Sequence, residues 1–125
     1  MGKSEDLIKL AENDLKIAIL VLNSSNDELM QNTAAYHVEQ AVEKIMKGLI
    51  VKAGGNASIS HSIVELSKDL DDLKVSYPEW IHDKDDDITS WATTIRYNAN
   101  FKSDHDEIQE VIDLTKEWIE LEKSK

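Results

Sequence analysis

The sequence predicts an all-α protein, an antiparallel bundle of four to five helices formed by one domain over residues 1–125. Four glycines and one proline among 125 residues leave few positions for the tight turns of an all-β domain. Apolar residues recur at steps of three and four along most of the chain, as on one face of a helix. The length suits a single core, and short connections favour antiparallel neighbours.

Each predicted helix has a start or stop signal. Ser, Asn and Asp side chains accept hydrogen bonds from free N–H groups at a helix start, and glycine adopts the left-handed backbone common at a helix end. Carboxylates in the first turn suit the positive end of the helix dipole. The expected helices run from Ser4 to about Leu22, from Asn26 or Asp27 to Gly54-Gly55, from Ser62 to about Lys74, from Asp85-Asp86-Asp87 to Arg96 or Tyr97, and from Ser103 through Ile119.

Residue spacing also places individual side chains. Glu43 and Lys47 lie one helical turn apart and are expected to pair on the outer side of the second helix. Trp91 and Trp118 fall on apolar faces and are expected in the core or at a dimer interface. The stretch 77–81, which contains the proline, is expected to be irregular.

Composition and charge exclude several classes of function. A net charge of −11 opposes non-specific binding to DNA or to an anionic membrane. The longest apolar run covers only residues 17–22, whereas a bilayer span takes about 20 residues. No secretory signal is visible at the N-terminus, so a cytoplasmic location is expected. The absence of cysteine excludes disulfides, thiolate catalysis and cysteine-ligated zinc.

No metal or cofactor is expected. The acidic run 83–87 resembles part of a calcium loop, but Ile88 and Thr94 occupy the glycine and glutamate positions of an EF-hand. A solvated helix N-terminus is the expected role of this run. Glu79 and His82 form a single Glu-X-X-His pair, whereas a di-iron bundle needs two such pairs.

The segment 36–49 resembles the second helix of HEPN domains, with its aromatic-X-X-X-Gln-Ala-X-Glu-Lys-X-X-Lys pattern. His61, at the start of an apolar helix, and the pair Arg96-Tyr97, at the end of the fourth helix, are similar to later parts of the same domain. Residues 11–15 are similar to its first helix. The resemblance covers nearly the whole chain.

The resemblance implies a helical bundle that forms homodimers and is often encoded beside a minimal nucleotidyltransferase, as a two-gene, toxin–antitoxin-like pair. Active members are metal-independent endoribonucleases with an arginine followed a few residues later by a histidine, and dimerisation brings two such motifs together. Here residues 101–103 contain no histidine, and eight residues stand between Arg96 and His105. The chain resembles the Arg-Tyr branch of the family, which lacks the strict nuclease motif.

Arg96 and His105 are the candidate catalytic residues. Metal-free RNA cleavage needs an acid or base with a pKa near 7 and a cation that stabilises the charged transition state. Arg96 is the one arginine beside thirteen lysines, and its planar guanidinium suits phosphate. In the structural alternative, Arg96 binds carbonyl groups at its helix end and pairs with a carboxylate, while His105 is simply exposed.

Further residues are candidates for binding RNA or a nucleotide. One group surrounds Arg96, and the other lies along one face of the second helix, where an imidazole and two ammonium groups could meet a phosphate. The alternative for the second group is a solvated helix face with His37 packed beside Tyr36. The candidate binding residues are Arg96, Tyr97, Asn98, Asn100, His37, Lys44 and Lys47.

Three functions stay open. The first is an accessory or toxin-like module of RNA or nucleotide biology that partners a minimal nucleotidyltransferase. The second is a metal-independent endoribonuclease that uses Arg96 and His105. The third is a bundle whose only role is assembly.

Overall fold

The computed structural model describes residues 2–24, 27–56, 62–97 and 103–125, with the backbone alone for residues 94–97, and over these residues it contains five α helices and no strand. The predicted all-α class is therefore confirmed. The helices are α1 (Lys3–Ser24), α2 (Glu28–Lys52), α3 (Ile63–Asp72), α4 (Trp80–Tyr97) and α5 (His105–Lys123).

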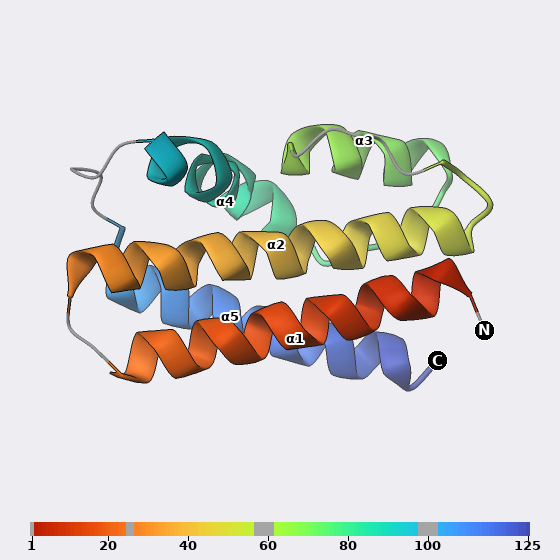
Figure 1. The fold of residues 1–125 in the computed structure, drawn as a ribbon. Coiled ribbons are helices and arrows are strands. Elements are labelled where there is room, and N and C mark those ends of the chain that lie inside the picture. The colour runs from red at the N-terminus through yellow and green to blue at the C-terminus, as the bar shows by residue number, and fades with distance from the viewer. Residues whose placement is uncertain (1, 25–26, 57–61, 98–102) are drawn as a thin grey trace.

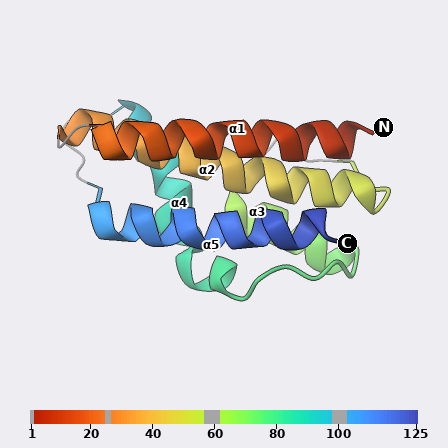
Figure 2. The ribbon, with the colours of Figure 1, turned by 90° about the horizontal axis from the view of Figure 1, so that it is seen from below.

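Helix α2 lies in the middle of the bundle. Helices α1 and α5 lie on one side of it, and α3 and α4 lie on the other (Figure 1). Helix α1 runs antiparallel to both α2 and α5 (Figure 2). The buried apolar side chains come from all five helices and form one cluster, in which Trp91 and Trp118 are 2% exposed. Helix α2 is thus covered from two sides, and its polar residues have to be accommodated inside the bundle.

Two of the predicted helix caps are confirmed. Asp27 and Ser62 cap α2 and α3 by accepting hydrogen bonds from backbone N–H groups of the first turn. Helix α5 differs, because Asp104 rather than Ser103 is its cap and accepts the N–H of Asp106 at 3.0 Å. Ser103 lies one residue before the cap and contacts α2 instead.

Helix α4 begins earlier than predicted, at Trp80. The Ile81 side chain is fully buried, and its N–H donates to the Pro78 carbonyl oxygen at 3.2 Å. Burial of Ile81 and the turn at Pro78 start the helix before the acidic run. The aspartates at 85–87 consequently lie inside α4 and do not form its N-terminus.

Helices α1 and α3 end close to the predicted positions. Helix α1 extends to Ser24, two residues beyond Leu22. Helix α3 ends at Asp72, because Lys74 has a left-handed backbone with φ 59°. The Val75 N–H then donates back to the last turn of α3.

Gly48 allows α1 to pack closely against α2. A Cβ atom at this position would lie 3.3 Å from both the Ile8 side chain and the Ser4 carbonyl oxygen. Glycine inside a helix costs about 1 kcal/mol relative to alanine. The close contact between the two helices offsets this cost.

A leucine at position 48 should force α1 away from α2. We expect Gly48→Leu to lower the free energy of unfolding by about 1–3 kcal/mol, as overpacking does in other cores. Urea denaturation followed by circular dichroism measures this change. Thr33→Leu, at an exposed position of the same helix, should change stability by less than about 0.5 kcal/mol. Equal stability of the two variants would contradict the close contact.

Candidate functional site

The candidate arginine lies at one end of the bundle. Arg96 and Tyr97 are the last two residues of α4, and this end of α4 lies beside the first half of α2 (Figures 1 and 2). Asn98, Asn100 and His61 lie outside the described residues. The binding roles predicted for Arg96 and its neighbours stay predictions.

His105 is the first residue of α5, and its side chain is 49% exposed. Its Nδ1 lies 3.7 Å from Asp106 Oδ1, which is too long for a hydrogen bond. Helix α5 begins on one side of α2, whereas α4 ends on the other side, at the same end of the bundle (Figure 1). Helix α2 therefore lies between the helix ends that carry Arg96 and His105, and their joint catalytic role stays a prediction.

Two amide side chains at the start of α2 hold the start of α5. Gln31 Nε2 donates to the Ser103 carbonyl oxygen at 2.5 Å. Asn32 Oδ1 accepts hydrogen bonds from Ser103 Oγ at 2.7 Å and from the Ser103 N–H at 3.3 Å. Asn32 is buried, so these bonds satisfy a polar group that water does not reach. They also fix the place at which His105 begins α5.

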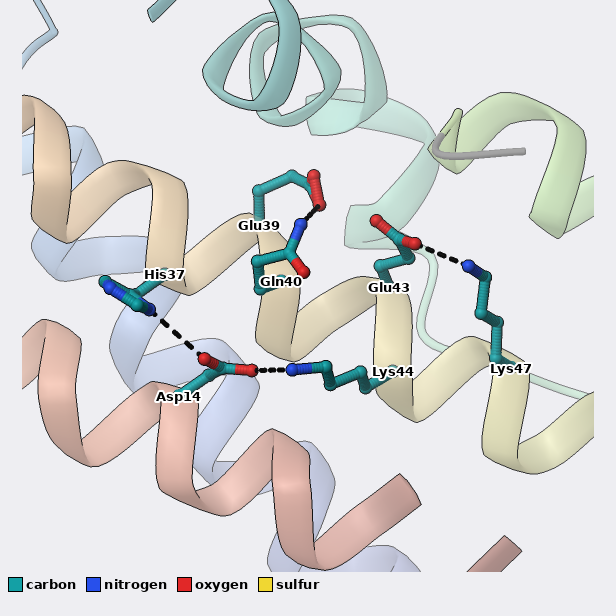
Figure 3. Close-up of polar contacts among 7 residues, drawn as sticks. All are labelled: Asp14, His37, Glu39, Gln40, Glu43, Lys44 and Lys47. Atoms are coloured by element: carbon teal, nitrogen blue, oxygen red, sulfur yellow. Dashed lines mark hydrogen bonds and ion pairs between the residues drawn. The ribbon is translucent and has the colours of Figure 1, made fainter. Parts of the chain in front are cut away.

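His37 and Lys44 both turn toward α1 and meet Asp14 (Figure 3). His37 Nδ1 lies 3.1 Å from Asp14 Oδ1, and the Lys44 ammonium pairs with Asp14 Oδ2. Asp14 is 7% exposed, and a carboxylate in that environment needs such partners. The Tyr36 ring packs edge-on against His37 with ring centroids 5.5 Å apart, as the structural alternative expects.

A second cluster of polar side chains on α2 lies on the side of α3 and α4 (Figure 3). Glu39 is fully buried and Glu43 is 3% exposed. Lys47 Nζ lies 2.5 Å from Glu43 Oε1, and Gln40 Nε2 donates to Glu39 Oε1 at 3.1 Å. The predicted Glu43–Lys47 pair is confirmed, but its predicted place on the outer side of the helix is wrong. Glu43 lies inside because α3 and α4 cover this face of α2.

Glu39 is protonated at neutral pH. Burial, followed by the hydrogen bond and the negative charge of Glu43, raises the pKa of Glu39 to about 9. The neutral carboxyl group of Glu39 can donate its proton to the ionised Glu43, whose charge Lys47 balances. The three side chains together then carry no net charge in the interior.

The two ammonium groups expected to bind a phosphate are already paired with carboxylates. Lys44 and Lys47 each neutralise a buried carboxylate. His37 is 25% exposed, and within the described part of the chain only its Nδ1 is hydrogen-bonded. An imidazole held at Nδ1 by a carboxylate presents Nε2 for hydrogen bonding or proton transfer. Asp14 thus fixes the orientation of the His37 ring, whereas the His105 side chain is 49% exposed.

Sequence reasoning did not single out Asp14 and Glu39. Asp14 lies three residues after Ala11 and four before Ala18, and Glu39 lies four residues after Ala35. Both carboxylates therefore stand within apolar helical faces. A carboxylate at such a position indicates an internal ion pair or a protonated acid, and this signal was present in the sequence.

One described histidine, His82, and the possible metal and membrane sites remain. His82 Nε2 lies 3.0 Å from the hydroxyl of Tyr77. Among the described residues, no three His, Asp or Glu side chains are grouped so that they could hold a metal ion. None of the helices, over its described residues, is both long and apolar enough to cross a membrane.

Comparison with known proteins shows the family to which this helical bundle belongs. A model of the HEPN domain matches residues 4–125. The chain belongs to the HEPN family. The solved structure of TT1696 from Thermus thermophilus is similar with a TM-score of 0.75 and 24% identity, over 95% of this chain and 94% of that chain. This second likeness concerns the fold alone. No curated protein matched the sequence.

Membership of the HEPN family connects this helical protein with nucleotide or RNA biology. The polar pattern by which α2 resembles HEPN domains has a structural explanation here. Gln40 and Lys47 contact the buried carboxylates of Glu39 and Glu43, and Lys44 pairs with Asp14 of α1. In this HEPN domain the pattern neutralises buried carboxylates, and its Lys44 joins α2 to α1.

The dependence of stability on pH tests the state of Glu39. The ordinary pKa of a glutamate is 4.5, whereas that of Glu39 in the folded protein is about 9, so the folded state keeps a proton that the unfolded state loses. The free energy of unfolding should therefore fall as pH rises from about 4.5 to about 9, by at most about 1.4 kcal/mol per pH unit. Urea denaturation at a series of pH values measures this fall.

Glu39→Gln keeps a neutral side chain and should reduce the fall in the free energy of unfolding between about pH 4.5 and about pH 9. The matched control is Glu117→Gln, at an exposed position of α5, which should leave the profile as it is. An unchanged profile in Glu39→Gln would contradict a protonated Glu39.

Proposed function

We propose that this HEPN protein binds RNA or a nucleotide at the end of the bundle where α4 ends. In this proposal it works as a homodimer and as an accessory or toxin-like partner of a minimal nucleotidyltransferase in a two-gene system. The family match supports the connection with nucleotides or RNA. The net charge of −11 requires the contact with a polyanion to be local and short-range.

The observation that carries the proposal is the place of the Arg96 turn relative to α2. This turn lies beside the first half of α2, at one end of the bundle (Figure 1), whereas the His37 ring turns to the other side of α2, toward Asp14 of α1 (Figure 3). A guanidinium is a group that binds phosphate oxygens. Lys44 and Lys47 support the site indirectly, since their ammonium groups hold carboxylates.

Two features support a homodimer. Within one chain, α2 lies between the helix ends that carry Arg96 and His105 (Figure 1), whereas a second copy can supply His105 from across a two-fold axis. Large apolar side chains are also exposed on α1 and at the start of α2, and exposed apolar surface favours association. These side chains are Leu10, Leu20, Leu29 and Met30.

A metal-independent endoribonuclease is the second candidate function. In such a reaction an imidazole accepts the proton of the 2′-hydroxyl as its oxygen attacks phosphorus, and the bond to the 5′-oxygen breaks with protonation of that oxygen. Arg96 would stabilise the negative charge of the transition state. The exposed ring of His105 favours this candidate, because an exposed imidazole can exchange protons with water.

Binding of a short single-stranded RNA tests the role of Arg96. We expect Arg96→Ala to weaken binding by about tenfold or more, as loss of a bidentate phosphate contact does, and Arg96→Lys to give an intermediate affinity. Lys68→Ala, at an exposed position of α3, is the control and should change affinity less than twofold. Fluorescence anisotropy with a labelled RNA gives the dissociation constants. Unchanged affinity in Arg96→Ala would contradict an RNA site at Arg96, and absence of RNA binding by the wild-type protein would leave assembly as the function of the bundle.

Cleavage of the same RNA in the presence of a chelator separates the two candidate functions. If the protein is a nuclease, His105→Ala or His37→Ala should abolish cleavage, and the variant that does so identifies the acid–base residue. Absence of cleavage by the wild-type protein, with binding intact, would contradict the endoribonuclease and support the binding module.

The partnership is tested by co-expression with the product of the adjacent gene. If that gene encodes a nucleotidyltransferase, the two proteins should purify together as a defined complex. An unrelated neighbouring gene, or separate elution of the two proteins, would contradict the partnership.

A further inference from the structure

We infer that a groove between α1 and α5 binds an acidic amphipathic helix of a partner protein. Two hollows, of about 470 Å³ and about 300 Å³, lie along these helices and share Glu12 and Lys123 in their lining. The two hollows adjoin at this pair, whose side chains lie 3.2 Å apart, and together we call them the α1–α5 groove. None of its lining residues belongs to the proposed RNA site, so this inference does not rest on that proposal.

The floor of the α1–α5 groove is apolar. Five aliphatic side chains line it, and no aromatic side chain does so. Apolar residues along a groove provide the contacts that one face of an amphipathic helix needs. The aliphatic lining residues are Ile8, Leu15, Ile19, Leu49 and Ile119.

Lysines form two rows along the edges of the groove. Lys9 and Lys16 lie seven residues apart on α1, and Lys116 and Lys123 lie seven residues apart on α5. Seven residues are two helical turns, so each pair lies on one face of its helix, about 10 Å apart. A bound helix with carboxylates at the same seven-residue spacing on both flanks would meet the ammonium groups of Lys9, Lys16 and Lys116 and would compete with Glu12 for that of Lys123.

The local charge favours an acidic occupant. Six lysines and four glutamates line the groove, in a chain whose net charge is −11. Lys123 pairs with Glu12 at 3.2 Å, whereas Lys9, Lys16 and Lys116 have no carboxylate within 4.0 Å among the described residues. Unpaired lysines beside an apolar floor attract a segment that is both acidic and apolar.

The same features disfavour RNA in the groove. Single-stranded nucleic acid binds to aromatic stacking platforms and to continuous positive charge. The groove lining contains no aromatic residue and includes glutamates between its lysines. Separate carboxylates on a helix can match such a mixed pattern, whereas a continuous chain of phosphates cannot.

Binding of designed peptides tests the inference. The lined part of α1, from Ser4 to Ile19, is about 22 Å long and accommodates about 15 residues of helix. The probe is a labelled 15-residue helical peptide with leucines on one face and glutamates on both flanks. Its matched control carries lysines in place of the glutamates. Fluorescence anisotropy with the full chain should show at least about tenfold tighter binding of the acidic peptide, weakening with added salt.

Lys16→Glu combined with Lys116→Glu should reduce the affinity for the acidic peptide by about tenfold or more. The control is Lys68→Glu combined with Lys74→Glu, which changes the net charge equally at exposed positions outside the groove and should have less than a twofold effect. Amide NMR shifts caused by the peptide should fall on α1 and α5. Thermal denaturation confirms that the variants are folded.

Four results would overturn the inference. The first two are equal binding of the two peptides and amide shifts confined to α3 and α4. The third is tighter binding of a short RNA than of the acidic peptide in this groove. The fourth is dissociation of a homodimer, without peptide, by the substitutions at Lys16 and Lys116. The last two would assign the groove to RNA or to a second copy of the chain. Loss of RNA binding in Arg96→Ala with intact peptide binding would separate the two proposals.

Discussion

The structure depends on the neutralisation of three buried carboxyl groups. Asp14 of α1 is buried against α2, and Glu39 and Glu43 of α2 are buried beneath α3 and α4 (Figure 3). Helix α2 is covered from both sides (Figure 1), so each ionisable group on those faces loses water and needs a partner. Lys44 and His37 supply it for Asp14, while Lys47 and a proton supply it for the pair Glu39 and Glu43. The contacts of Asp14 join α1 to α2 and fix how these two helices pack, because a shift of α1 by one turn would leave the buried carboxylate of Asp14 alone.

This arrangement limits which residues remain for recognition. The lysines that sequence reasoning placed toward a phosphate hold carboxylates instead, so an incoming anion would have to compete with an internal ion pair. Arg96 belongs to the last turn of α4, and the Nε2 atom of His37 has no hydrogen bond within the described part of the chain. Under the proposed function, recognition belongs to the end of the bundle where α4 ends (Figure 1), whereas the buried ion pairs lie in its middle.

The sequence was sufficient for features that depend on neighbours along the chain. The helical class, the caps Asp27 and Ser62, and the Glu43–Lys47 pair all follow from spacings of two to four residues. The burial of Glu43 could not be predicted in the same way, because it depends on which helices cover α2. The early start of α4 likewise depends on the burial of Ile81, a tertiary contact that overrides the local preference for aspartates at a helix start.

The central claim is that α2 contains a carboxyl group, that of Glu39, which remains protonated in the folded protein because burial and the neighbouring Glu43 raise its pKa. NMR titration of the glutamate carboxyl carbons of the folded protein tests this claim most directly. We predict that Glu39 titrates near pH 9, the value to which burial and Glu43 raise its pKa. Titration of every glutamate below pH 6 would contradict the account, since Glu39 would then be an ionised carboxylate in the interior.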